Sequence, residues 1–381
     1  MEKIRVAFEA TALLGSRSGV GEFAYGLLTR LSDGYTEVDA FAVSWRKRHL
    51  LEGELPLGVG FVDRVMPARP LHLLWDIIDA PKIELILGGG YDIVHGSNFF
   101  VPPSRSAKRV VTVHDLTPLH FPEMCLAPVL KYPRYIAKAI ADGVFIHTPT
   151  EFVKREVMEV FGASEDQVFA VPHGVPTDAY GTLDGVSEGF VAKIREIAAG
   201  RKVLLAIGTI EPRKGYVEFL SAFSLLQQRR KDLVLIVAGA KGWGWDSFEA
   251  KRSTLVDSSA VVALGWVSAA ERKWLYDNAT VLVFPSICEG FGLPALEAMA
   301  RRLPVICSAA GATEEVVGDC GVIVKGNDPV LWSDAVEEVI DDTEIRTDLS
   351  SRGKIRAETF TWEKSASEMR IEYRKILESH G

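Results

Sequence analysis

Two glutamates, Glu289 and Glu297, flank a glycine-rich segment that contains Gly290, Gly292 and Pro294. A carboxylate accepts hydrogen bonds from the neighbouring hydroxyl groups of a sugar, and exposed backbone N–H groups beside glycines can bind phosphate oxygens. One glutamate could therefore hold a hexose and the other a ribose, with phosphates between them. The residue types and their spacing predict a binding site for a nucleotide sugar.

A second candidate group is the adjacent cation pair Arg213 and Lys214, which follows the apolar run of residues 202–209 and precedes a helical pattern. A guanidinium binds phosphate oxygens in a fork and an ammonium acts as a point charge, so the pair is placed to bind a diphosphate. The chain contains no Asp-x-Asp motif of the kind that holds a divalent ion in many transferases. We therefore expect no metal and assign neutralisation of the leaving diphosphate to this pair.

The residues around the two glutamates indicate a strand, a loop and a helix. Residues 281–284 form an apolar β-prone run, and Pro294 stands where proline is favoured, in the first turn of a helix. Glu289 then lies in the loop and Glu297 lies one turn into the helix. The positive end of the helix dipole adds to a socket of backbone N–H groups. The residues predicted to form this socket are Gly290, Phe291, Gly292 and Leu293.

Strands alternate with helices along the whole chain, which predicts an α/β protein with two parallel sheets, each doubly wound. The expected strands are residues 4–8, 41–45, 91–96, 109–115, 143–149, 202–209, 232–239, 261–264, 281–284 and 304–307, and residues 168–175 close the first half of the chain. The expected helices are residues 22–31, 132–141, 151–161, 216–229, 269–278, 312–317 and 362–377.

The length of 381 residues suits two domains. Residues 177–188, rich in Gly, Ser, Asp and Thr, are interpreted as the linker between them. We expect a first domain of residues 1–180, completed by the last helix at 362–381, and a second domain of residues 181–361.

Two of the expected strands end in a histidine, His95 and His114. Ligands of open α/β sheets bind at the carboxyl ends of the strands, so both side chains are candidates for the cleft between the domains. We interpret His95 as a histidine with satisfied hydrogen bonds near that cleft.

Gly19 and Gly21 belong to a sequence that fits the G-x-G-x-x-A fingerprint of dinucleotide-binding proteins, with Glu37 or Asp39 as a ribose ligand. In a dehydrogenase, however, the first glycine follows the strand almost immediately, whereas here about nine residues intervene. We interpret this stretch as a longer loop that faces phosphate or acceptor. A plain tight turn remains an alternative.

Composition and charge narrow the class of protein. The chain is 48% hydrophobic and 25% charged, as in a soluble globular enzyme, and its net charge of −8 argues against nucleic-acid binding. Four cysteines without C-x-x-C spacing indicate a reduced, cytoplasmic protein, and no apolar run approaches the roughly 18 residues that span a membrane.

Three basic residues, Lys131, Arg134 and Lys138, recur near helical spacing. They form either a solvated face or a face that attracts an anionic surface or acceptor.

The segment from Glu289 to Glu297 closely resembles the signature of retaining glycosyltransferases of family 4, Glu-Gly-Phe-Gly-Leu-Pro-x-x-Glu. The His-Asp at 114–115, the Val-Pro-His-Gly-Val at 171–175 and the Arg-Lys-Gly at 213–215 are similar to further motifs of that family. The resemblance covers nearly the whole chain and is weakest between residues 45 and 90. It implies the GT-B fold, in which two Rossmann-like, doubly wound parallel-sheet domains face each other across a central cleft.

The same resemblance implies roles for individual residues. The implied catalytic residues are His114, Arg213, Lys214 and Glu289. The implied substrate-binding residues are Gly19, Gly21, Gly208, Val267, Gly290, Phe291, Gly292, Leu293 and Glu297.

The activity implied by the resemblance is a retaining, metal-independent transfer of a hexose, with mannose slightly favoured over glucose. The donor is a nucleoside diphosphate sugar, no further cofactor is expected, and the acceptor hydroxyl belongs to a glycan, a lipid-linked molecule or a small molecule. We expect a cytoplasmic protein, and peripheral contact with the inner face of the membrane stays open. The alternatives are another GT-B enzyme, such as a sugar-nucleotide epimerase or a phosphorylase, an NAD-dependent dehydrogenase, and a non-catalytic sugar-nucleotide binder.

Overall fold

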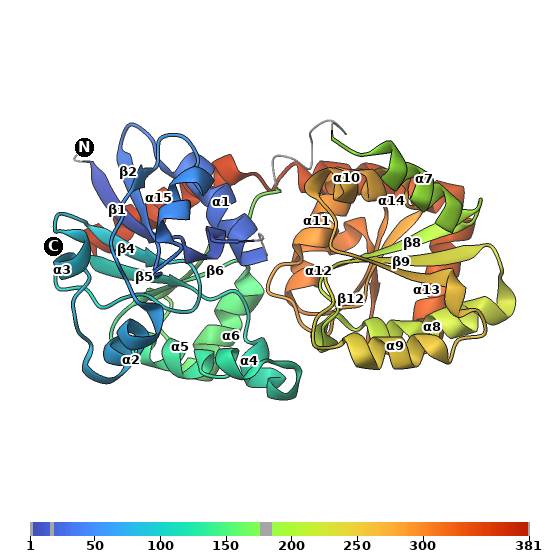
Figure 1. The fold of residues 1–381 in the computed structure, drawn as a ribbon, viewed down its shortest axis with the longest axis horizontal. Helices are drawn as coiled ribbons and strands as arrows, with labels where there is room; N and C mark the ends of the chain where they lie inside the picture. Colours follow the sequence, from blue (N-terminus) through green and yellow to red (C-terminus); the bar gives the residue numbers. More distant parts are fainter. Residues whose placement is uncertain (1–2, 16–18, 176–184, 380–381) are drawn as a thin grey trace. The chain divides into compact units, whose positions relative to one another are not determined.

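The computed structural model describes residues 3–15, 19–175 and 185–379. The chain divides into two compact units (Figure 1): unit 1 comprises residues 1–174 and 360–381, and unit 2 comprises residues 175–359. The expected boundary between residues 180 and 181, like most of the expected linker, lies outside the described residues.

Unit 1 is built on a parallel sheet of seven strands in the order β3-β2-β1-β4-β5-β6-β7. The strands are β1 (Ile4–Glu9), β2 (Thr36–Phe41), β3 (Gly60–Phe61), β4 (Ile93–Gly96), β5 (Lys108–Thr112), β6 (Phe145–Thr148) and β7 (Val168–Ala170). The helices are α1 (Gly19–Leu31), α2 (Ala68–Ile78), α3 (Glu84–Leu87), α4 (Thr117–His120), α5 (Tyr132–Ala141), α6 (Glu151–Phe161) and α15 (Trp362–Glu378). Short 3-10 turns are η1 (Thr11–Leu13), η2 (Arg48–Leu50), η3 (Glu52–Glu54), η4 (Pro122–Met124) and η5 (Ala127–Val129).

Unit 2 is built on a parallel sheet of six strands in the order β10-β9-β8-β11-β12-β13. The strands are β8 (Lys202–Ile207), β9 (Leu233–Ala238), β10 (Val261–Gly265), β11 (Val281–Phe284), β12 (Val305–Ser308) and β13 (Val322–Val324). The helices are α7 (Glu188–Ala198), α8 (Tyr216–Arg229), α9 (Trp245–Ser253), α10 (Ala269–Asn278), α11 (Leu293–Ala300), α12 (Ala312–Val317), α13 (Pro329–Asp341) and α14 (Thr343–Ala357), and the 3-10 turns are η7 (Pro212–Lys214), η8 (Ser258–Ala260) and η9 (Gly318–Cys320). Helices α8 and α9 cover one face of this sheet and α10 and α11 cover the other (Figure 1), so the predicted doubly wound α/β architecture is confirmed.

The second strand of unit 1 differs from the expectation. The strand predicted at residues 41–45 is wrong, because β2 ends at Phe41. Its Val38 and Ala40 are buried and pair in parallel register with Val6 and Phe8 of β1. The strand therefore begins at Thr36 and ends at Phe41, the residue with which the predicted strand began.

The helix at the end of the chain completes the core of unit 1. Figure 1 shows α15, drawn in red, among the blue elements of the amino-terminal part of the chain. Its Trp362 lies so close to α1 that a Cβ atom on Gly26 would be 2.0 Å from the indole ring. A Cβ on Gly174 would be 2.3 Å from the backbone nitrogen of Trp362. Two glycines thus make room for one tryptophan, which joins a buried cluster with Phe23 and Tyr373.

Both sheets have a point at which the strand order reverses. In unit 1 it lies between β1 and β4, and in unit 2 between β8 and β11. Loops that leave the carboxyl ends of such strand pairs diverge, and ligands of doubly wound sheets bind in the crevice between them. The search for a site therefore begins at the ends of these four strands.

No described helix combines the length and the apolar character needed to cross a membrane.

Candidate active site

The reversal point of unit 2 brings the two predicted donor loops into direct contact. The backbone N–H of Ile287, in the loop after β11, donates to the carbonyl oxygen of Arg213, in the loop after β8, at 2.7 Å. Gly215 has a φ of +65°, and a Cβ at this position would lie 2.0 Å from the carbonyl oxygen of Pro285. Glycine is required here both for the left-handed backbone and for the close approach of the loops.

Charged side chains from both loops form a buried cluster. Lys214 Nζ lies 2.5 Å from Glu289 Oε1, and Arg213 Nη1 donates to Glu289 Oε2 at 3.1 Å. Arg213 also bridges to Glu211, with Nε 2.6 Å from Oε1. Lys214 and Glu289 are only 7% and 8% exposed. The structure therefore gathers three predicted catalytic residues and adds a second carboxylate, Glu211, which sequence reasoning had not selected.

The cluster keeps Glu289 ionised. Burial by itself would raise the pKa of its carboxyl group, but the charges of Lys214 and Arg213 outweigh that effect and lower the pKa to about 2. Burial lowers the pKa of the Lys214 ammonium, as does the neighbouring Arg213, while Glu289 acts in the opposite direction. The site thus holds a desolvated, ionised carboxylate in contact with the side chains of Lys214 and Arg213.

Glu297 lies on α11 and is also buried, but its partners come from a different helix. The hydroxyl of Tyr276 donates to Glu297 Oε2 at 2.8 Å, and Arg272 Nε lies 3.2 Å from the same oxygen. Both partners belong to α10, one turn apart. The two residues were not identified from the sequence, although their i, i+4 spacing places them on one face of the predicted helix.

Two buried phenols connect the surroundings of the two glutamates. Burial raises the pKa of Tyr216, and the charge of Glu289 raises it further. Burial likewise raises the pKa of Tyr276, with the charge of Glu297 next and a smaller contribution from Tyr216. Because these effects fall off with distance, Tyr216 lies near Glu289, and Tyr276 lies near both Glu297 and Tyr216.

The predicted glycines of unit 2 lie at positions that a side chain would disturb. Gly208 directly follows β8 with a φ of +142°, and a Cβ at this position would lie 3.3 Å from Cε of Lys214. Gly292 is the N-cap of α11 with a φ of +93°. Of the other residues in the predicted socket, Gly290 and Phe291 are buried, and Leu293 begins the helix.

Val267 occupies a different part of unit 2. It follows β10, an edge strand that β9 separates from β8, and directly precedes Ser268, the N-cap of α10. The structure thus places this predicted contact for the nucleotide base beside the helix that also carries Arg272 and Tyr276.

In unit 1, His114 follows β5 and lies among aromatic rings. Its Nε2–H donates to the carbonyl oxygen of Ser97 at 2.9 Å, and its ring meets Phe23 edge-on with centroids 5.2 Å apart. Burial lowers the pKa of the imidazole, and the contact with Ser97 acts in the opposite direction. A neutral ring that donates through Nε2 keeps Nδ1 as an acceptor.

Gly19 and Gly21 lie in the first turn of α1, four and two residues before Phe23. The helix was predicted to begin at residue 22, and it begins instead at Gly19. The three residues before it lie outside the described part of the chain, and so does that portion of the predicted loop. The ribose ligands considered for a dinucleotide site are not at a strand end: Asp39 lies within β2 and accepts from the hydroxyl of Tyr91 at 3.0 Å.

His95 has the satisfied hydrogen bonds that were expected. His147 Nε2–H donates to the carbonyl oxygen of Val171 at 3.0 Å, so its Nδ1 accepts from the hydroxyl of Thr112, also at 3.0 Å. Thr112 in turn accepts from His95 Nε2–H at 2.8 Å, and His95 Nδ1 accepts from Tyr373 at 2.6 Å. The tautomers of His147 and His95 in this chain of hydrogen bonds both follow from the carbonyl oxygen of Val171, which can only accept a hydrogen bond.

A further candidate, Glu9, was missed by sequence reasoning. It ends β1 at the reversal point of unit 1 and is buried, with Oε1 accepting from the backbone N–H of Thr11 at 2.9 Å and Oε2 accepting from Ser97 Oγ at 3.2 Å. The backbone carbonyl oxygen of the same Ser97 accepts the hydrogen bond from His114 Nε2–H. An available signal was the single carboxylate directly after the apolar run of residues 4–8.

Two family models match the chain, one in each half. Residues 17–179 match the model described as Glycosyltransferase Family 4, and residues 190–356 match the model described as Glycosyl transferases group 1. The second match includes all the residues of the Arg213, Lys214 and Glu289 cluster.

Two curated relatives are each 30% identical to this chain over the aligned residues. The chain is 30% identical over 273 residues to the O-antigen chain mannosyltransferase B of Escherichia coli, covering 71% of each chain. It is also 30% identical over 252 residues to the D-inositol 3-phosphate glycosyltransferase of Paenarthrobacter aurescens, covering 62% of this chain and 59% of the relative.

Solved structures show the same fold at lower sequence identity. The sucrose-phosphate synthase of Thermosynechococcus elongatus superposes with a TM-score of 0.75 at 18% identity, covering 99% of this chain and all of the other. The Anabaena protein HepE in complex with UDP and glucose superposes with a TM-score of 0.71 at 17% identity, covering 97% of this chain and 98% of that one. The fold is therefore GT-B.

Proposed function

Because the chain belongs to the group 1 glycosyltransferases of family 4, we propose that it transfers a hexose from a nucleoside diphosphate sugar to an acceptor hydroxyl, retaining the anomeric configuration and using no metal ion. The observation that carries this proposal is the cluster of Arg213, Lys214 and Glu289 at the reversal point of unit 2. It presents two cations and one ionised carboxylate at the place where doubly wound sheets bind nucleotides.

The cations have enough donors for both the carboxylate and a diphosphate. An ammonium has three N–H donors and a guanidinium has five; Glu289 takes one contact from each of Lys214 and Arg213, and Arg213 also contacts Glu211 and the carbonyl oxygen of Cys288. Lys214 has N–H donors in addition to the one directed at Glu289, and these can bind phosphate oxygens without breaking the cluster. In a poorly solvated site, such preorganised charge stabilises a leaving diphosphate more strongly than water does.

The two glutamates have different surroundings, which supports different roles. Glu289 is held by the phosphate-binding cations, so we assign it to the hexose and to the positive charge that develops there. Glu297 is held by Arg272 and Tyr276 on α10, the helix that follows Val267, so we assign it to the ribose hydroxyls.

In the proposed reaction, the bond between the anomeric carbon and the β-phosphate oxygen breaks, and its electron pair stays with the nucleoside diphosphate. The acceptor oxygen forms its bond to the anomeric carbon on the same face of the sugar that the nucleoside diphosphate leaves. The acceptor proton passes to a β-phosphate oxygen. Arg213 and Lys214 neutralise the departing charge, and His114 of unit 1, with Nδ1 as an acceptor, binds a hydroxyl of the donor hexose.

The donor and the acceptor are assigned by class. Mannose is the preferred hexose, supported by the similarity to a mannosyltransferase, and glucose is the second choice. The acceptor is a hydroxyl of a glycan, a lipid-linked molecule or a small molecule. The four cysteines, Cys125, Cys288, Cys307 and Cys320, all lie within the described residues and form no disulfide, which supports the proposed location in the reducing cytoplasm.

A thermal-shift panel of GDP, UDP, ADP and their hexose conjugates tests donor recognition. A nucleotide at one hundred times its dissociation constant is expected to stabilise the protein by about 2.7 kcal/mol, and NAD is expected to have no effect. Product analysis with the preferred donor then separates transfer, which needs an acceptor and yields a glycoside of unchanged anomeric configuration, from epimerisation and phosphorolysis. An inverted glycoside would refute the retaining mechanism.

A further inference from the structure

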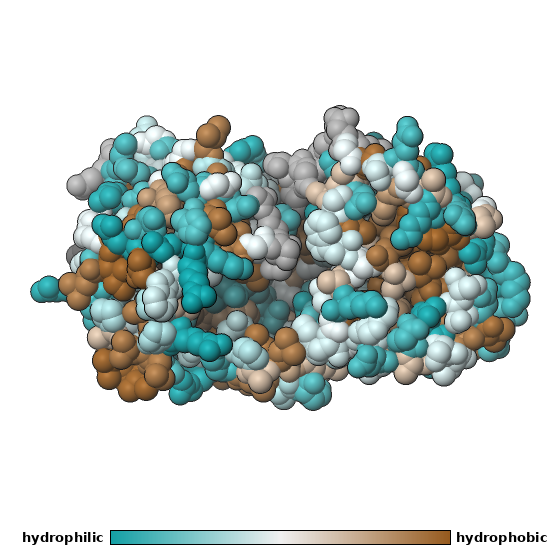
Figure 2. All heavy atoms as spheres, viewed as in Figure 1, coloured by the Kyte–Doolittle hydropathy of each residue, from teal (hydrophilic) through white to brown (hydrophobic). Residues whose placement is uncertain are grey.

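Glu9 is a buried acidic residue at the reversal point of unit 1. On the face of the molecule drawn in Figure 2, hydrophilic side chains are spread over the surface of both units, whereas Glu9 ends β1 and is only 9% exposed. Burial raises the pKa of its carboxyl group, and the hydrogen bonds from Thr11 and Ser97 act in the opposite direction. Within residues 3–15, 19–175 and 185–379, no cation pairs with it. Because a buried acidic group without a cation destabilises a fold, its presence at this position indicates a function.

The carboxyl group of Glu9 joins two segments of unit 1. Glu9 lies beside Gly96 in the parallel register of β1 and β4, so the segments that follow these strands start side by side. Oε1 accepts from the backbone N–H of Thr11 at 2.9 Å, and Oε2 accepts from Ser97 Oγ at 3.2 Å. Thr11 follows β1 and Ser97 follows β4. One side chain therefore holds the loop after β4 to the end of β1.

Ser97 is also the hydrogen-bond partner of His114. Its backbone carbonyl oxygen accepts from His114 Nε2–H at 2.9 Å. A carbonyl can only accept, so this contact places the hydrogen on Nε2 and leaves Nδ1 as an acceptor. Ser97 is completely buried, which keeps water from replacing its carbonyl as the partner. The tautomer of the imidazole therefore depends on the position of the Ser97 peptide, and Glu9 holds the Ser97 side chain.

The loop after β4 has a backbone that needs such support. A Cβ on Gly96 would lie 1.9 Å from the carbonyl oxygen of Phe100, so the chain turns back on itself at once. Phe99 has a φ of +57°, in the left-handed region that residues with a side chain rarely adopt. Its backbone N–H donates to the carbonyl oxygen of Thr112 at 2.8 Å. A strained turn of this kind persists only where the surrounding structure holds it.

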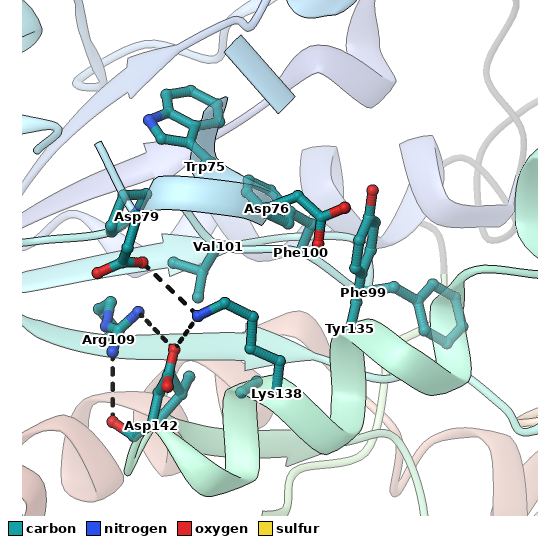
Figure 3. A pocket seen from close by; sticks show the side chains of 13 residues that line it. Trp75, Asp76, Asp79, Phe99, Phe100, Val101, Arg109, Tyr135, Lys138 and Asp142 are labelled. Carbon is teal, nitrogen blue, oxygen red and sulfur yellow. Dashed lines mark hydrogen bonds and ion pairs between the residues drawn. The ribbon is translucent and has the colours of Figure 1, made fainter. Parts of the chain in front are cut away.

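Aromatic rings hold the apolar side chains of the loop. Phe99 and Phe100 line a cavity between α2 and α5 (Figure 3), whose volume of about 30 Å³ leaves room for about two water molecules. Phe100 stacks on Trp75 with centroids 5.6 Å apart, and Phe99 stacks on Tyr132 with centroids 4.4 Å apart. The edge of the Phe99 ring arrangement also reaches His114, at a centroid distance of 5.9 Å. The rings thus fix the apolar part of the loop and leave its polar part to the carboxyl group.

We propose that Glu9 is a positioning residue for His114. Through Ser97 it holds the loop after β4 in the conformation that accepts the imidazole Nε2–H, so that Nδ1 remains the acceptor for a hydroxyl of the donor hexose. Because Ser97 presents Glu9 with a neutral hydroxyl, the role depends on hydrogen bonding and not on negative charge. The proposal rests on the proposed function, since it concerns the residue assigned there to the hexose.

Kinetics of single and double variants test the role. Glu9→Ala and Ser97→Ala should each lower kcat/KM for the donor about tenfold, the effect of losing one hydrogen bond. Affinity for the free nucleoside diphosphate, which is assigned to unit 2, should be unchanged. Glu9→Gln should stay within about threefold of wild type, because an amide still accepts a hydrogen bond. In the background of His114→Ala, Glu9→Ala should have no further effect, because the residue that it positions is absent.

A spectroscopic measurement tests the same contact without any substrate. In the full-length protein labelled with ¹⁵N-histidine, ring correlation spectra should show His114 as the Nε2–H tautomer in wild type and in Glu9→Gln, and as a mixture of tautomers in Glu9→Ala. The spectrum of His114→Ala identifies the signal. The matched control is Glu84→Ala in the same unit, because Glu84 likewise accepts from a serine hydroxyl, that of Ser104 at 2.5 Å, and from a backbone N–H, that of Arg105 at 2.8 Å. It should change neither the tautomer of His114 nor kcat/KM.

Several results would overturn the proposal. An Nδ1–H tautomer of His114 in wild type would do so, as would a Glu9→Ala variant with wild-type kcat/KM and an unchanged tautomer. Equal losses in Glu9→Gln and Glu9→Ala would assign the role to the charge instead, and additive losses in the His114→Ala background would show an independent one. Thermal unfolding midpoints show whether each variant is folded, and Ser97→Ala, the smaller change, carries the test if Glu9→Ala is not. A wild-type protein without transferase activity, but with a tautomer that depends on Glu9, would refute the proposed function and not the positioning contact.

Discussion

Lys214 Nζ lies 2.5 Å from Glu289 Oε1, although 75 positions separate the two residues in the chain. The contact exists because β8 and β11 are neighbours in the sheet, so that the loops after them meet. The cation assigned to the leaving diphosphate therefore directly contacts the carboxylate assigned to the hexose. Binding energy need not be used to bring these two groups together.

We predict that Lys214→Ala and Arg213→Ala each lower turnover by two or more orders of magnitude, because each removes positive charge from a leaving group in a poorly solvated site. The loss of one such contact typically costs about 3 to 4 kcal/mol of transition-state stabilisation. Steady-state kinetics measure the effect. Arg229→Ala, which removes an exposed arginine paired with Glu337, is the control and should retain wild-type turnover. Near-normal rates in both cluster variants would eliminate the proposed role.

The two glutamates should respond differently to substitution. Glu289→Gln is expected to reduce the rate strongly while leaving affinity for the free nucleoside diphosphate nearly intact. Glu297→Gln should weaken that affinity by roughly 1.5 to 3 kcal/mol, because a charged hydrogen bond to the ribose is lost. Calorimetric titration of both variants with the free diphosphate decides the matter: equal losses, or the reverse order, would show that the roles are wrongly assigned.

Tyr276→Phe should act through Glu297. The variant removes the hydroxyl that donates to Glu297 Oε2 at 2.8 Å and leaves the carboxylate with Arg272. Affinity for the nucleoside diphosphate should fall by about 1 kcal/mol, the usual value of one hydrogen bond. In the background of Glu297→Gln the same change should have a smaller effect, and full additivity in this double-mutant cycle would contradict a positioning role.

The stability of unit 2 should depend on the ionisation of Glu289. Its pKa falls from the usual 4.5 to about 2 on folding, so its contribution to the free energy of unfolding is complete above about pH 4.5 and is lost as the pH falls toward 2. The difference corresponds to something on the order of 3 kcal/mol. Urea titrations between pH 5.5 and 3 should show a shallower pH dependence for Glu289→Gln than for wild type. Glu123→Gln, at an exposed position, is the control, and identical slopes for all three proteins would count against the buried cluster.

Activity should survive treatment with EDTA, because Arg213 and Lys214 supply the positive charge that a divalent ion provides elsewhere. Initial rates before and after chelation, and after re-addition of magnesium or manganese, measure this. A complete loss of activity that only a metal restores would require a different mechanism.

The sequence was a good guide where local patterns are strong. Helices α5, α6, α8, α10 and α12 have the predicted bounds, because apolar spacing and terminal residues such as Ser268, an N-cap whose side chain accepts from the backbone of Glu271, act within a few positions. Glu289 was placed in a loop and Glu297 one turn into a helix for the same reason, and both placements are confirmed.

Other features depend on contacts between distant segments, which a single sequence does not specify. The pairing of Arg213 with Glu211 and Glu289, and of Glu297 with Tyr276, follows from strand order and helix packing. Helix α2 was not predicted, although its polar residues Arg69, His72 and Asp76 recur at helical spacing; it lies between residues 45 and 90, where the resemblance to the family is weakest.

The place of Trp362 beside Gly26 has a consequence for the order of folding during synthesis. Domains usually fold one after another as they leave the ribosome, the amino-terminal one first. Here the first sheet is made early, but its core lacks Trp362 and Tyr373 until all of unit 2 has been translated. The nascent chain must therefore carry an incomplete amino-terminal unit while the later unit folds, and the unit that is begun first is the last to be finished.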